Sequence, residues 1–558
     1  MNLKPSYSLV VLLFLFISLL SSAASASGNS DQTTHLGTIY SEAARLDPYK
    51  EFGGYAQTPN NAKYSAISNS LFVLALLKEN EIARNDWLQK QATELLQFIK
   101  KSFTDIYFDD SNGNAFLSFY DRQYPESHQR TARLARDQAL IALAFSKGAA
   151  ISSDTLIQEN YLSLSFETLN YLKRSFGSSN GWEKGHTPYS QSHYANDTSR
   201  DVADIAHIII SILEIPIAEQ HYASEERQIN VDVCIQAANF IDTHARNSDG
   251  HIIDKISENG TIISDTVSCR TNALYGIANI RLFEETGNGS FLARAEANLQ
   301  TIEDLFADIG FPGYIAATAD TLSGKRLTDN SLTCLLATLV YKHNAGNLLA
   351  RRIFAEVAEF LQTTFFNPWV DLDCAVVSRG LLVSDIFSFG SSSYKLWVLS
   401  QLPHILTARA PDEIERGSSF AAEIEIFCPL SIELTLNITG PEIKSKIQTF
   451  YSSGEEENAQ RQQITIVIPE TAETGHTRVS VEINYLNRSI SAMEFPLSIR
   501  SEGILVPRGI IFVIGAGGLG ALALLVKYPP RQIKELLEMA VDDQGERDKN
   551  APASKKEN

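Results

Sequence analysis

The side chains best suited to proton transfer lie in one polar stretch, residues 183–204, which reads EKGHTPYSQSHYANDTSRDVAD. Its candidate members are His186, Tyr189, His193, Arg200 and Asp204. An imidazole can act as general acid or general base near neutral pH. We therefore predict His186 and His193 as catalytic groups, with Asp204 beside them. The alternative interpretation is an ordinary surface loop.

A second chemistry would use paired carboxylates. Inverting glycosidases place two carboxyl groups roughly 6.5–9.5 Å apart, one acting as acid and the other as base. Asp137 and Asp204 each begin a strongly apolar stretch, and Asp329 lies within reach of the same cavity. We predict Asp137 and Asp204 as catalytic carboxylates. Their alternative role is to cap a helix, because a carboxylate accepts hydrogen bonds from the unpaired N–H groups of a first turn.

Arginine and tyrosine side chains in the polar segments are candidates for substrate binding. A guanidinium group holds carboxylate or phosphate groups, and aromatic rings with hydrogen-bonding neighbours suit a sugar. The predicted substrate-binding residues are Arg133, Tyr189, Arg200, Arg270, Tyr314, Arg326 and Arg379. Salt bridges to the surrounding acidic loops are the alternative role for the arginines.

Metal, cofactor and nucleic-acid chemistry find no support in the sequence. The five cysteines are dispersed and form no cluster with zinc-site spacing, so we predict no metal site. GAGGLG at 515–520 matches a dinucleotide fingerprint, but the 38 residues after it leave no room for the required βαβ unit, and we predict no cofactor. A formal net charge of −19 excludes broad nucleic-acid binding, which needs clustered Lys and Arg.

One pattern recurs along the chain, a polar residue followed at once by an apolar run of helical length. The starters are Asn69, Asp137, Asp204, Asn272, Asn330 and Ser393, which stand 58 to 68 residues apart. Most runs are followed by a second, amphipathic stretch such as 87–103 or 349–365. We interpret the starters as helix N-caps.

This repeat predicts an (α/α)6 toroid over residues 35–406, with apolar inner helices surrounded by half-exposed outer helices. The leading segment 35–49 would supply the outer partner of the sixth inner helix and so close the ring. Because all inner helices would point the same way, their N-terminal ends should converge on one mouth. The candidate residues above lie in the segments that enter those ends.

The repeated unit resembles the six-hairpin glycosidase superfamily. Within it, the resemblance is closest to N-acylglucosamine 2-epimerase and cellobiose-epimerase-like toroids and to the toroid of thioredoxin-fused relatives. DNSLTCLLATLVYKHNAGNLLARRIFAEVAEFLQTTF, at 329–365, carries it most clearly. The resemblance implies a toroid fold and a saccharide substrate. Such epimerases use two facing histidines; neither aligns with a motif here, so His186 and His193 are candidates by loop position alone.

After Ala408 the apolar period changes from helical to alternating, in segments such as FAAEIEIFCPL and HTRVSVEINYL. Alternating strands separated by Pro-, Gly- and Glu-rich turns predict an immunoglobulin- or fibronectin-like β-sandwich over residues 409–500. The sandwich offers no candidate site. We interpret it as a stalk.

The two most apolar segments lie near the ends. Residues 1–26 have the form of a secretory signal peptide, with LVVLLFLFISLL before an Ala-Ser-Ala exit. Residues 507–527 contain eighteen consecutive uncharged residues, which predicts a single transmembrane helix whose small residues would allow a helix-mediated dimer. Flanking Lys and Arg favour a cytoplasmic tail at 528–558, with the larger part of the chain outside the cell.

Five N-x-S/T sequons all fall in the part predicted to lie outside the cell. They are at Asn196, Asn259, Asn288, Asn437 and Asn487. Because sequons also arise by chance, they are compatible with this topology and do not establish it.

These observations favour a membrane-anchored, cell-surface protein acting on extracellular saccharide, as a sugar epimerase or isomerase or as a glycosidase. The alternative is a non-catalytic receptor or adhesin that binds glycan or protein through the toroid. Convergence of two histidines or two carboxylates in the central cavity would favour the enzyme.

Overall fold

The computed structural model describes residues 32–500, except 52, 58–62, 105–114, 122–131, 179, 191–192, 216–223, 309–311, 318–323, 368–371, 374, 379–380, 383–386, 444 and 455–458. The predicted signal peptide at 1–26, membrane helix at 507–527 and tail at 528–558 therefore lie outside the described residues. Within the described ranges, no helix has the length and apolar character needed to cross a bilayer.

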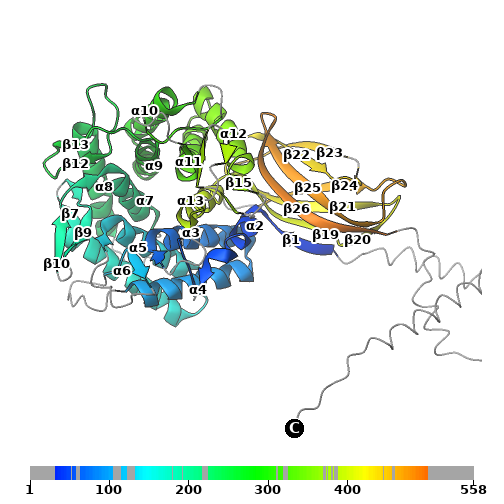
Figure 1. Cartoon of the computed structure of the whole chain (residues 1–558), viewed down its shortest axis with the longest axis horizontal. Coiled ribbons are helices and arrows are strands. Elements are labelled where there is room, and N and C mark those ends of the chain that lie inside the picture. Colours follow the sequence, from blue (N-terminus) through cyan, green and yellow to red (C-terminus); the bar gives the residue numbers. More distant parts are fainter. Residues whose placement is uncertain are drawn as a thin grey trace, which may run out of the picture. The chain divides into compact units, whose positions relative to one another are not determined.

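Six helices of the described chain form a closed inner ring (Figure 1). They are α3 (Ala66–Ala83), α5 (Ala135–Ile151), α7 (Val202–Glu214), α9 (Cys269–Thr286), α11 (Leu327–His343) and α13 (Phe389–Leu399). Each packs against the next, and α13 packs against α3 to complete the circle. Nearly every side chain of α3, α9 and α11 before the last turn is buried, which explains why these sequences are apolar on all sides.

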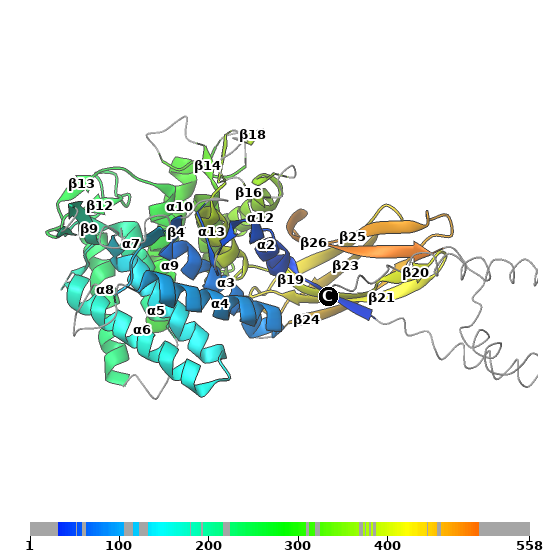
Figure 2. The same cartoon turned by 60° about the horizontal axis from the view of Figure 1, so that its bottom comes forward.

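An outer layer of helices covers the ring (Figure 2). It consists of α4 (Asp86–Phe103), α6 (Thr155–Phe176), α8 (Ser224–His244), α10 (Gly289–Phe306), α12 (Leu348–Thr363) and α2 (Thr38–Ala44), which is followed by the 3₁₀ turn Asp47–Tyr49. The short helix α2 packs against α13. The N-terminal segment therefore supplies the outer partner of the last inner helix, and the described region is a mainly helical toroid.

The polar starters do not cap the inner helices, contrary to our interpretation. The residues at the N-cap positions are Ser65, Leu134, Asp201, Ser268, Arg326 and Ser388. The starters are the third to fifth residues of their helices and are buried. Several of them bond the backbone of the preceding segment instead: Asn330 accepts from the Tyr314 N–H at 2.8 Å and donates to the Tyr314 carbonyl at 3.0 Å. Asn69 makes the same pair of bonds to Tyr55.

Short strands lie in the segments that lead into the inner helices. They are β2 (Lys50–Glu51), β3 (Gly54–Tyr55), β4 (Lys63–Ser65), β5 (Phe119–Asp121), β6 (Arg133–Leu134), β7 (Gly177–Ser178), β8 (Gly181–Trp182), β9 (Gly185–Ser190), β10 (His193–Asp197), β11 (Arg200–Asp201), β12 (Lys255–Ile256), β13 (Ile262–Ser264), β14 (Lys325–Arg326), β15 (Phe366–Asn367), β16 (Leu372–Asp373), β17 (Val376–Ser378) and β18 (Leu381–Leu382).

The C-terminal region is a pair of antiparallel sheets. Its strands are β19 (His404–Pro411), β20 (Glu413–Glu415), β21 (Ser419–Phe427), β22 (Glu433–Thr439), β23 (Lys446–Tyr451), β24 (Gln460–Val467), β25 (Gly475–Tyr485) and β26 (Arg488–Arg500). One sheet has the order β1-β19-β21-β24 and the other β20-β26-β25-β22-β23. Alternate residues of β21 and β25 are buried, as the period of two in the sequence predicts.

The first sheet contains a strand from the other end of the chain. Strand β1 (Gln32–Leu36) pairs antiparallel with β19, from Gln32 opposite Pro411 to Leu36 opposite Thr407. The predicted boundaries place His35 in the toroid and start the sandwich at residue 409, whereas the structure places His35 in this sheet and begins β19 at His404. The toroid sequence is thus inserted between two neighbouring strands of one sheet.

Hydrogen bonds and ion pairs join the sandwich to the toroid. The buried His404 Nε2 lies 2.7 Å from Glu79 Oε2 on α3, and His404 Nδ1 lies 2.8 Å from the Leu402 carbonyl. On another side, Arg488 binds Glu359 of α12 at 2.5 Å. These contacts join the sandwich to the C-terminal half of the inner helix α3 and to the outer helix α12.

The described sequon residues differ in their surroundings. Asn259, Asn288 and Asn487 are exposed, and Asn288 also caps α10 by accepting from the Ser290 N–H at 3.0 Å. Asn437 is only partly exposed on β22, between two paired strands. Glycosylation at these positions stays a prediction.

Candidate functional site

The first turns of the inner helices bring charged side chains to the mouth of the ring. The third residues of α5, α7 and α11 are Asp137, Asp204 and Asp329, and all three are at most 3% exposed. The second residues of α5 and α9 are Arg136 and Arg270. These residues occupy equivalent positions in the repeat, so their side chains point toward the same axis. We call this group of buried charged side chains at the mouth the polar floor.

Arg136 joins two of the carboxylates. Its Nε lies 3.1 Å from Asp137 Oδ1 and its Nη1 lies 2.7 Å from Asp204 Oδ1. The Arg136 side chain is 20% exposed, whereas those of Asp137 and Asp204 are 1% and 5% exposed. The second oxygen of each carboxylate, Oδ2, is buried without a hydrogen-bond partner among the described residues. One guanidinium therefore holds a pair of carboxylates that keep unused acceptor capacity.

Burial and charge oppose each other in this triad. Burial raises the pKa of Asp137, and the adjacent Arg136 guanidinium and the Ser118 hydroxyl offset that rise only in part. Burial alone would lower the pKa of Arg136, but the two carboxylates outweigh it and raise that pKa well above its usual range. Arg136 therefore stays charged, while Asp137 is held closer to protonation than an ordinary aspartate.

A second chain of hydrogen bonds crosses the ring. Arg270 Nη2 donates to the Tyr394 hydroxyl at 2.9 Å, and that oxygen lies 2.7 Å from His207 Nε2. His207 comes from α7 and Tyr394 from α13, which are three places apart around the circle of six inner helices. Their contact therefore bridges the centre of the ring. Burial, together with Arg270 and Arg136, lowers the pKa of His207 well below its usual range.

This relay has a defined direction. A neutral His207 can accept the Tyr394 proton at Nε2 only if its own proton sits on Nδ1, which is buried without a partner in the described residues. Burial raises the pKa of Tyr394, although Arg270 and Arg136 partly compensate. The hydroxyl thus accepts from an arginine and donates to a neutral imidazole.

Two further carboxyl groups near the mouth are biased toward protonation. Burial raises the pKa of Asp329 to about 6, with Arg270 and Arg326 opposing it. Burial and the neighbouring Asp204 raise the pKa of Asp201 to about 6. Asp201 caps α7, accepting from the Asp204 N–H at 3.2 Å. The cap that the sequence assigned to Asp204 is therefore made by Asp201, and Asp204 is left for the triad.

The other predicted binding residues are not gathered at this floor. Arg200 is buried, donates to the Asn180 carbonyl and lies over the Phe240 ring of α8 with 5.0 Å between the guanidinium carbon and the ring centroid. Tyr314 is buried and donates to Glu303 Oε2 on α10 at 2.7 Å. Both serve the packing of outer helices. Substrate binding by these two residues stays a prediction.

Among the remaining predicted residues, Arg270 lies in the floor, Arg326 is exposed at the start of α11, and Arg133 is buried in β6. His186, Tyr189 and His193 belong to the hairpin β9–β10, in which His186 pairs with both Arg133 and Asn196. The side chains of this hairpin lie outside the described part of the structure. Arg379 also lies outside the described residues.

Three members of the floor were missed from the sequence. Arg136 directly precedes Asp137 and could have been found from the repeat, because Arg270 stands at the same position of α9. His207 and Tyr394 are each embedded in an apolar helix, and 187 residues separate them. Nothing local in the sequence indicates that they meet.

Metal-binding and thiol chemistry have no site in the described residues. No group of three or more His, Cys, Asp or Glu side chains there is arranged to hold a metal ion. Cys234, Cys269, Cys334 and Cys428 are buried free thiols. Cys374 lies outside the described residues.

Comparisons with known proteins agree with this architecture. The sequence matches no protein-family model and no curated protein. A D-mannose isomerase matches with a TM-score of 0.54 and 11% identity, covering 65% of this chain and 96% of its own. Cellobiose 2-epimerase from Bacillus thermoamylovorans matches with a TM-score of 0.54 and 9% identity, covering 65% and 98%. A GH76 α-mannanase from Bacteroides thetaiotaomicron matches with a TM-score of 0.50 and 10% identity, covering 65% and 95%.

The likeness is one of fold. At these identities, the matches show that the described toroid shares the six-hairpin architecture of isomerases, epimerases and mannanases, as the sequence resemblance implied. They do not assign an activity.

Proposed function

We propose that this chain is a cell-surface, membrane-anchored enzyme that acts on saccharide at the mouth of the toroid. The Arg136-bridged carboxylates Asp137 and Asp204 carry the proposal. The shared fold with D-mannose isomerase, cellobiose epimerase and α-mannanase supports the substrate class. The apolar segments at both ends of the sequence support the location.

Of the two chemistries expected from the sequence, the described floor favours glycosidic hydrolysis. Hydrolysis needs one carboxyl group that carries a proton and one that is ionised. Asp137, whose pKa burial raises, suits the acid, and Asp204, whose Oδ1 lies 2.7 Å from Arg136 Nη1, is the candidate for the second carboxyl group. His207 suits proton abstraction poorly because it is buried, its pKa is lowered well below the usual range, which makes it a weak base, and its Nε2 is bonded to Tyr394.

Substrate access requires Arg136 to move. Its side chain is more exposed than either carboxylate, so it separates them from the mouth. Rotation of the guanidinium away from Asp137 Oδ1, with its 2.7 Å contact to Asp204 Oδ1 kept, would leave Asp137 facing the glycosidic oxygen. The long, flexible arginine stem makes this a side-chain rotation rather than a change of fold.

The second candidate is a non-catalytic saccharide receptor. The low exposure of Asp137 and Asp204 favours this candidate, because buried carboxylates neutralised by an internal arginine are also typical of a purely structural ion network. In that case the mouth would bind ligand through the outer loops, and the triad would only hold the helices together.

Turnover separates the two candidates. The full-length protein is incubated with a library of α- and β-linked oligosaccharides, and the products are resolved by chromatography and mass spectrometry. We expect release of shorter saccharides, and a loss of at least about a hundredfold in Asp137→Asn and in Asp204→Asn. Asp154→Asn is the matched control, because Asp154 caps the outer helix α6 at an exposed position and asparagine caps equally well.

Variants of the two predicted histidines test the alternative mechanism. Turnover that survives both aspartate variants but is lost in His186→Ala or His193→Ala would replace the carboxylate mechanism with histidine-based chemistry. Saccharide binding without turnover in any arm would favour the receptor. Circular dichroism of every variant distinguishes loss of activity from loss of fold.

A further inference from the structure

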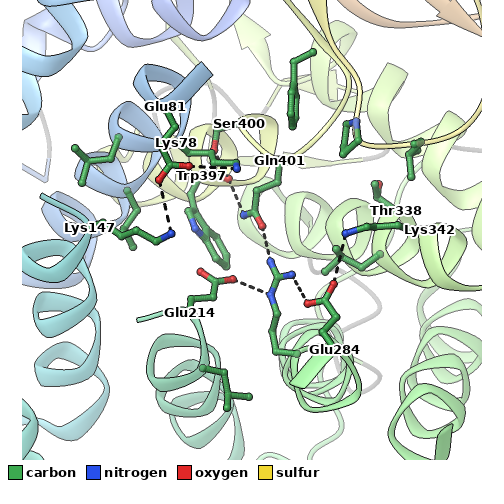
Figure 3. Close-up of a pocket in the computed structure, with 18 of the residues that line it drawn as sticks. Lys78, Glu81, Lys147, Glu214, Glu284, Thr338, Lys342, Trp397, Ser400 and Gln401 are labelled. Carbon is green, nitrogen blue, oxygen red and sulfur yellow. Dashed lines mark hydrogen bonds and ion pairs between the residues drawn. The ribbon is translucent and has the colours of Figure 1, made fainter. Parts of the chain in front are cut away.

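A cavity lies among the inner helices at the end opposite the mouth. It has a volume of about 330 Å³ and is lined by residues from the C-terminal halves of all six inner helices, with Phe427, Pro429 and Leu430 of the sandwich on one side (Figure 3). The Tyr394–His207 bridge crosses the ring between this cavity and the mouth. The volume lies at the lower end of those of ligand pockets and suits a molecule the size of one hexose.

The lining combines an aromatic and aliphatic surface with ionic walls. Trp397, one turn beyond Tyr394 on α13, lines the cavity together with leucines from α3, α7 and α11. Figure 3 shows its indole between a wall bearing Lys147 and Glu81 and a wall bearing Gln401 and Glu284. An apolar ring flanked by converging polar groups is the usual setting for a sugar.

One wall is built rigidly around Arg281. Its Nε lies 2.8 Å from Glu214 Oε1, its Nη1 lies 2.7 Å from Glu284 Oε2 and its Nη2 donates to Gln401 at 2.9 Å. His343 and Lys342 also approach Glu284, at 2.8 and 3.7 Å. Burial would raise the pKa of Glu284, but the hydrogen bond with His343 and the charges of Arg281 and Lys342 outweigh it and lower the pKa to about 2. This wall presents fixed carboxylate acceptors.

The other wall has more cationic than anionic groups. Lys78 and Lys147 share the single carboxylate of Glu81, with N–O distances of 3.4 and 3.7 Å. Charge-assisted hydrogen bonds of this kind are normally about 2.7–2.9 Å long, and each ammonium has three donors. The described residues therefore leave both ammonium groups with donor capacity, and the group of Lys78, Lys147 and Glu81 has a net positive charge. Over the whole lining, four cations balance four carboxylates: Lys78, Lys147, Arg281 and Lys342 against Glu81, Glu214, Glu284 and Glu285.

We propose that this cavity binds a hexose-sized sugar acid. Its carboxylate would lie between Lys78 and Lys147, its ring against Trp397, and its hydroxyls against Glu284 and Gln401. The proposal does not depend on catalysis at the mouth, because the bridge of Tyr394 and His207 separates the two sites. Because Phe427 and Leu430 close one side, the bound ligand would also tie the sandwich to the toroid.

Calorimetric titration of the full-length protein tests the proposal, with glucuronate as the probe and glucose and acetate as matched compounds lacking the charge or the ring. We expect glucuronate to bind at least about tenfold more tightly than either, and more weakly as salt rises. Lys78→Met and Lys147→Met keep the aliphatic stems and should each weaken binding about tenfold. Lys90→Met, at a site 71% exposed on α4, is the control and should bind as the wild type does.

The variants at the mouth separate this site from the proposed enzyme. Asp137→Asn should leave glucuronate affinity unchanged, whereas loss of affinity in that variant would place the ligand at the mouth and overturn the proposal. Equal affinity for glucose and glucuronate, or binding that neither lysine variant weakens, would overturn it as well. In that case the lysines only neutralise the carbonyl ends of the inner helices.

Discussion

Both ends of the inner ring carry carboxylates beside cations, but the carboxyl pKa values are shifted in opposite directions at the two ends. At the mouth, Asp137 and Asp329 are 1% exposed, and burial raises the pKa of both carboxyl groups. At the other end, Glu284 is 25% exposed and lies among cations that lower its pKa to about 2. A carboxylate destabilises the fold where the cost of its desolvation exceeds the attraction of the nearby cations. It stabilises the fold where the cations outweigh that cost.

The difference follows from the helix ends themselves. The mouth gathers short aspartates in first turns, where the backbone is tightly packed, and supplies two arginines to the described floor. The opposite end gathers long glutamates and lysines from last turns, and these side chains reach solvent. Strained carboxylates are typical of reacting sites, whereas satisfied ones are typical of framework or of fixed ligand contacts.

The largest expected effect comes from removing the mouth's bridging cation. Arg136→Met leaves Asp137 and Asp204 buried beside each other without the guanidinium that both contact. We expect a loss of about 3–5 kcal/mol in the free energy of unfolding at pH 7, measured by urea denaturation. The loss should shrink as the pH falls, because protonation of Asp137, whose pKa burial raises, neutralises one of the two buried carboxylates that the variant leaves without a cation. Adding Asp204→Asn should restore part of it.

A surface arginine provides the matched control. Arg352 also contacts two carboxylates, at 2.7 Å to Glu303 and 3.3 Å to Glu356, but its side chain is 47% exposed. Arg352→Met should cost less than about 1 kcal/mol. Equal losses in both variants would show that burial does not distinguish the mouth triad from a surface ion pair.

Most of the fold was predictable because it is repetitive. The inner helices are buried on nearly every side, so their sequences are continuously apolar and recur at a spacing of 58 to 68 residues. Strand β1 was not predictable. QTTHL lacks alternating apolar residues, and it becomes a strand only because β19, more than 360 residues later, offers an edge to pair with.

The candidate site was only partly predictable. Asp137 and Asp204 were identified because they begin apolar runs, but the sequence could not show that one guanidinium joins them. The starters looked like N-caps because Asn and Asp favour that position. In Asn69 and Asn330 the amide instead pairs with a backbone that the sequence places 14 or 16 residues earlier. A hydrogen bond between residues so far apart in the sequence cannot be predicted from a local sequence pattern.

The second prediction tests the end opposite the mouth. Glu284→Gln removes a carboxylate that several cations stabilise, so we expect a loss of about 3 kcal/mol at pH 7, from the difference between a folded pKa of about 2 and an unfolded value near 4.3. Because the folded pKa is depressed, this contribution is present above pH 4 and is lost as the pH falls toward 2. Chemical denaturation of wild type and variant across that window measures it.

Glu94→Gln is the control for this end. Glu94 is 43% exposed and lies 3.6 and 4.0 Å from Lys50 and Lys90, so its variant should lose less than about 0.5 kcal/mol at any of these pH values. A Glu284 variant that matches the control would mean that the cations around the cavity do not converge on that carboxylate.

The smallest expected effect has the opposite sign and lies at the mouth. Asp329 has a buried oxygen without a hydrogen-bond partner among the described residues, and its folded pKa of about 6 exceeds the unfolded value near 3.9. A raised carboxyl pKa makes the fold most stable below pH 4 and less stable as the pH rises through 6. Asp329→Asn removes that penalty, and the difference of about 2 pKa units corresponds to a gain of about 3 kcal/mol or slightly less at pH 7, which vanishes near pH 4. Asp304→Asn, at an exposed position on α10, should change stability by less than about 0.5 kcal/mol throughout.

If Asp329→Asn is instead less stable than the wild type at pH 7, Arg270 outweighs burial at the mouth, and the contrast between the two ends of the ring fails.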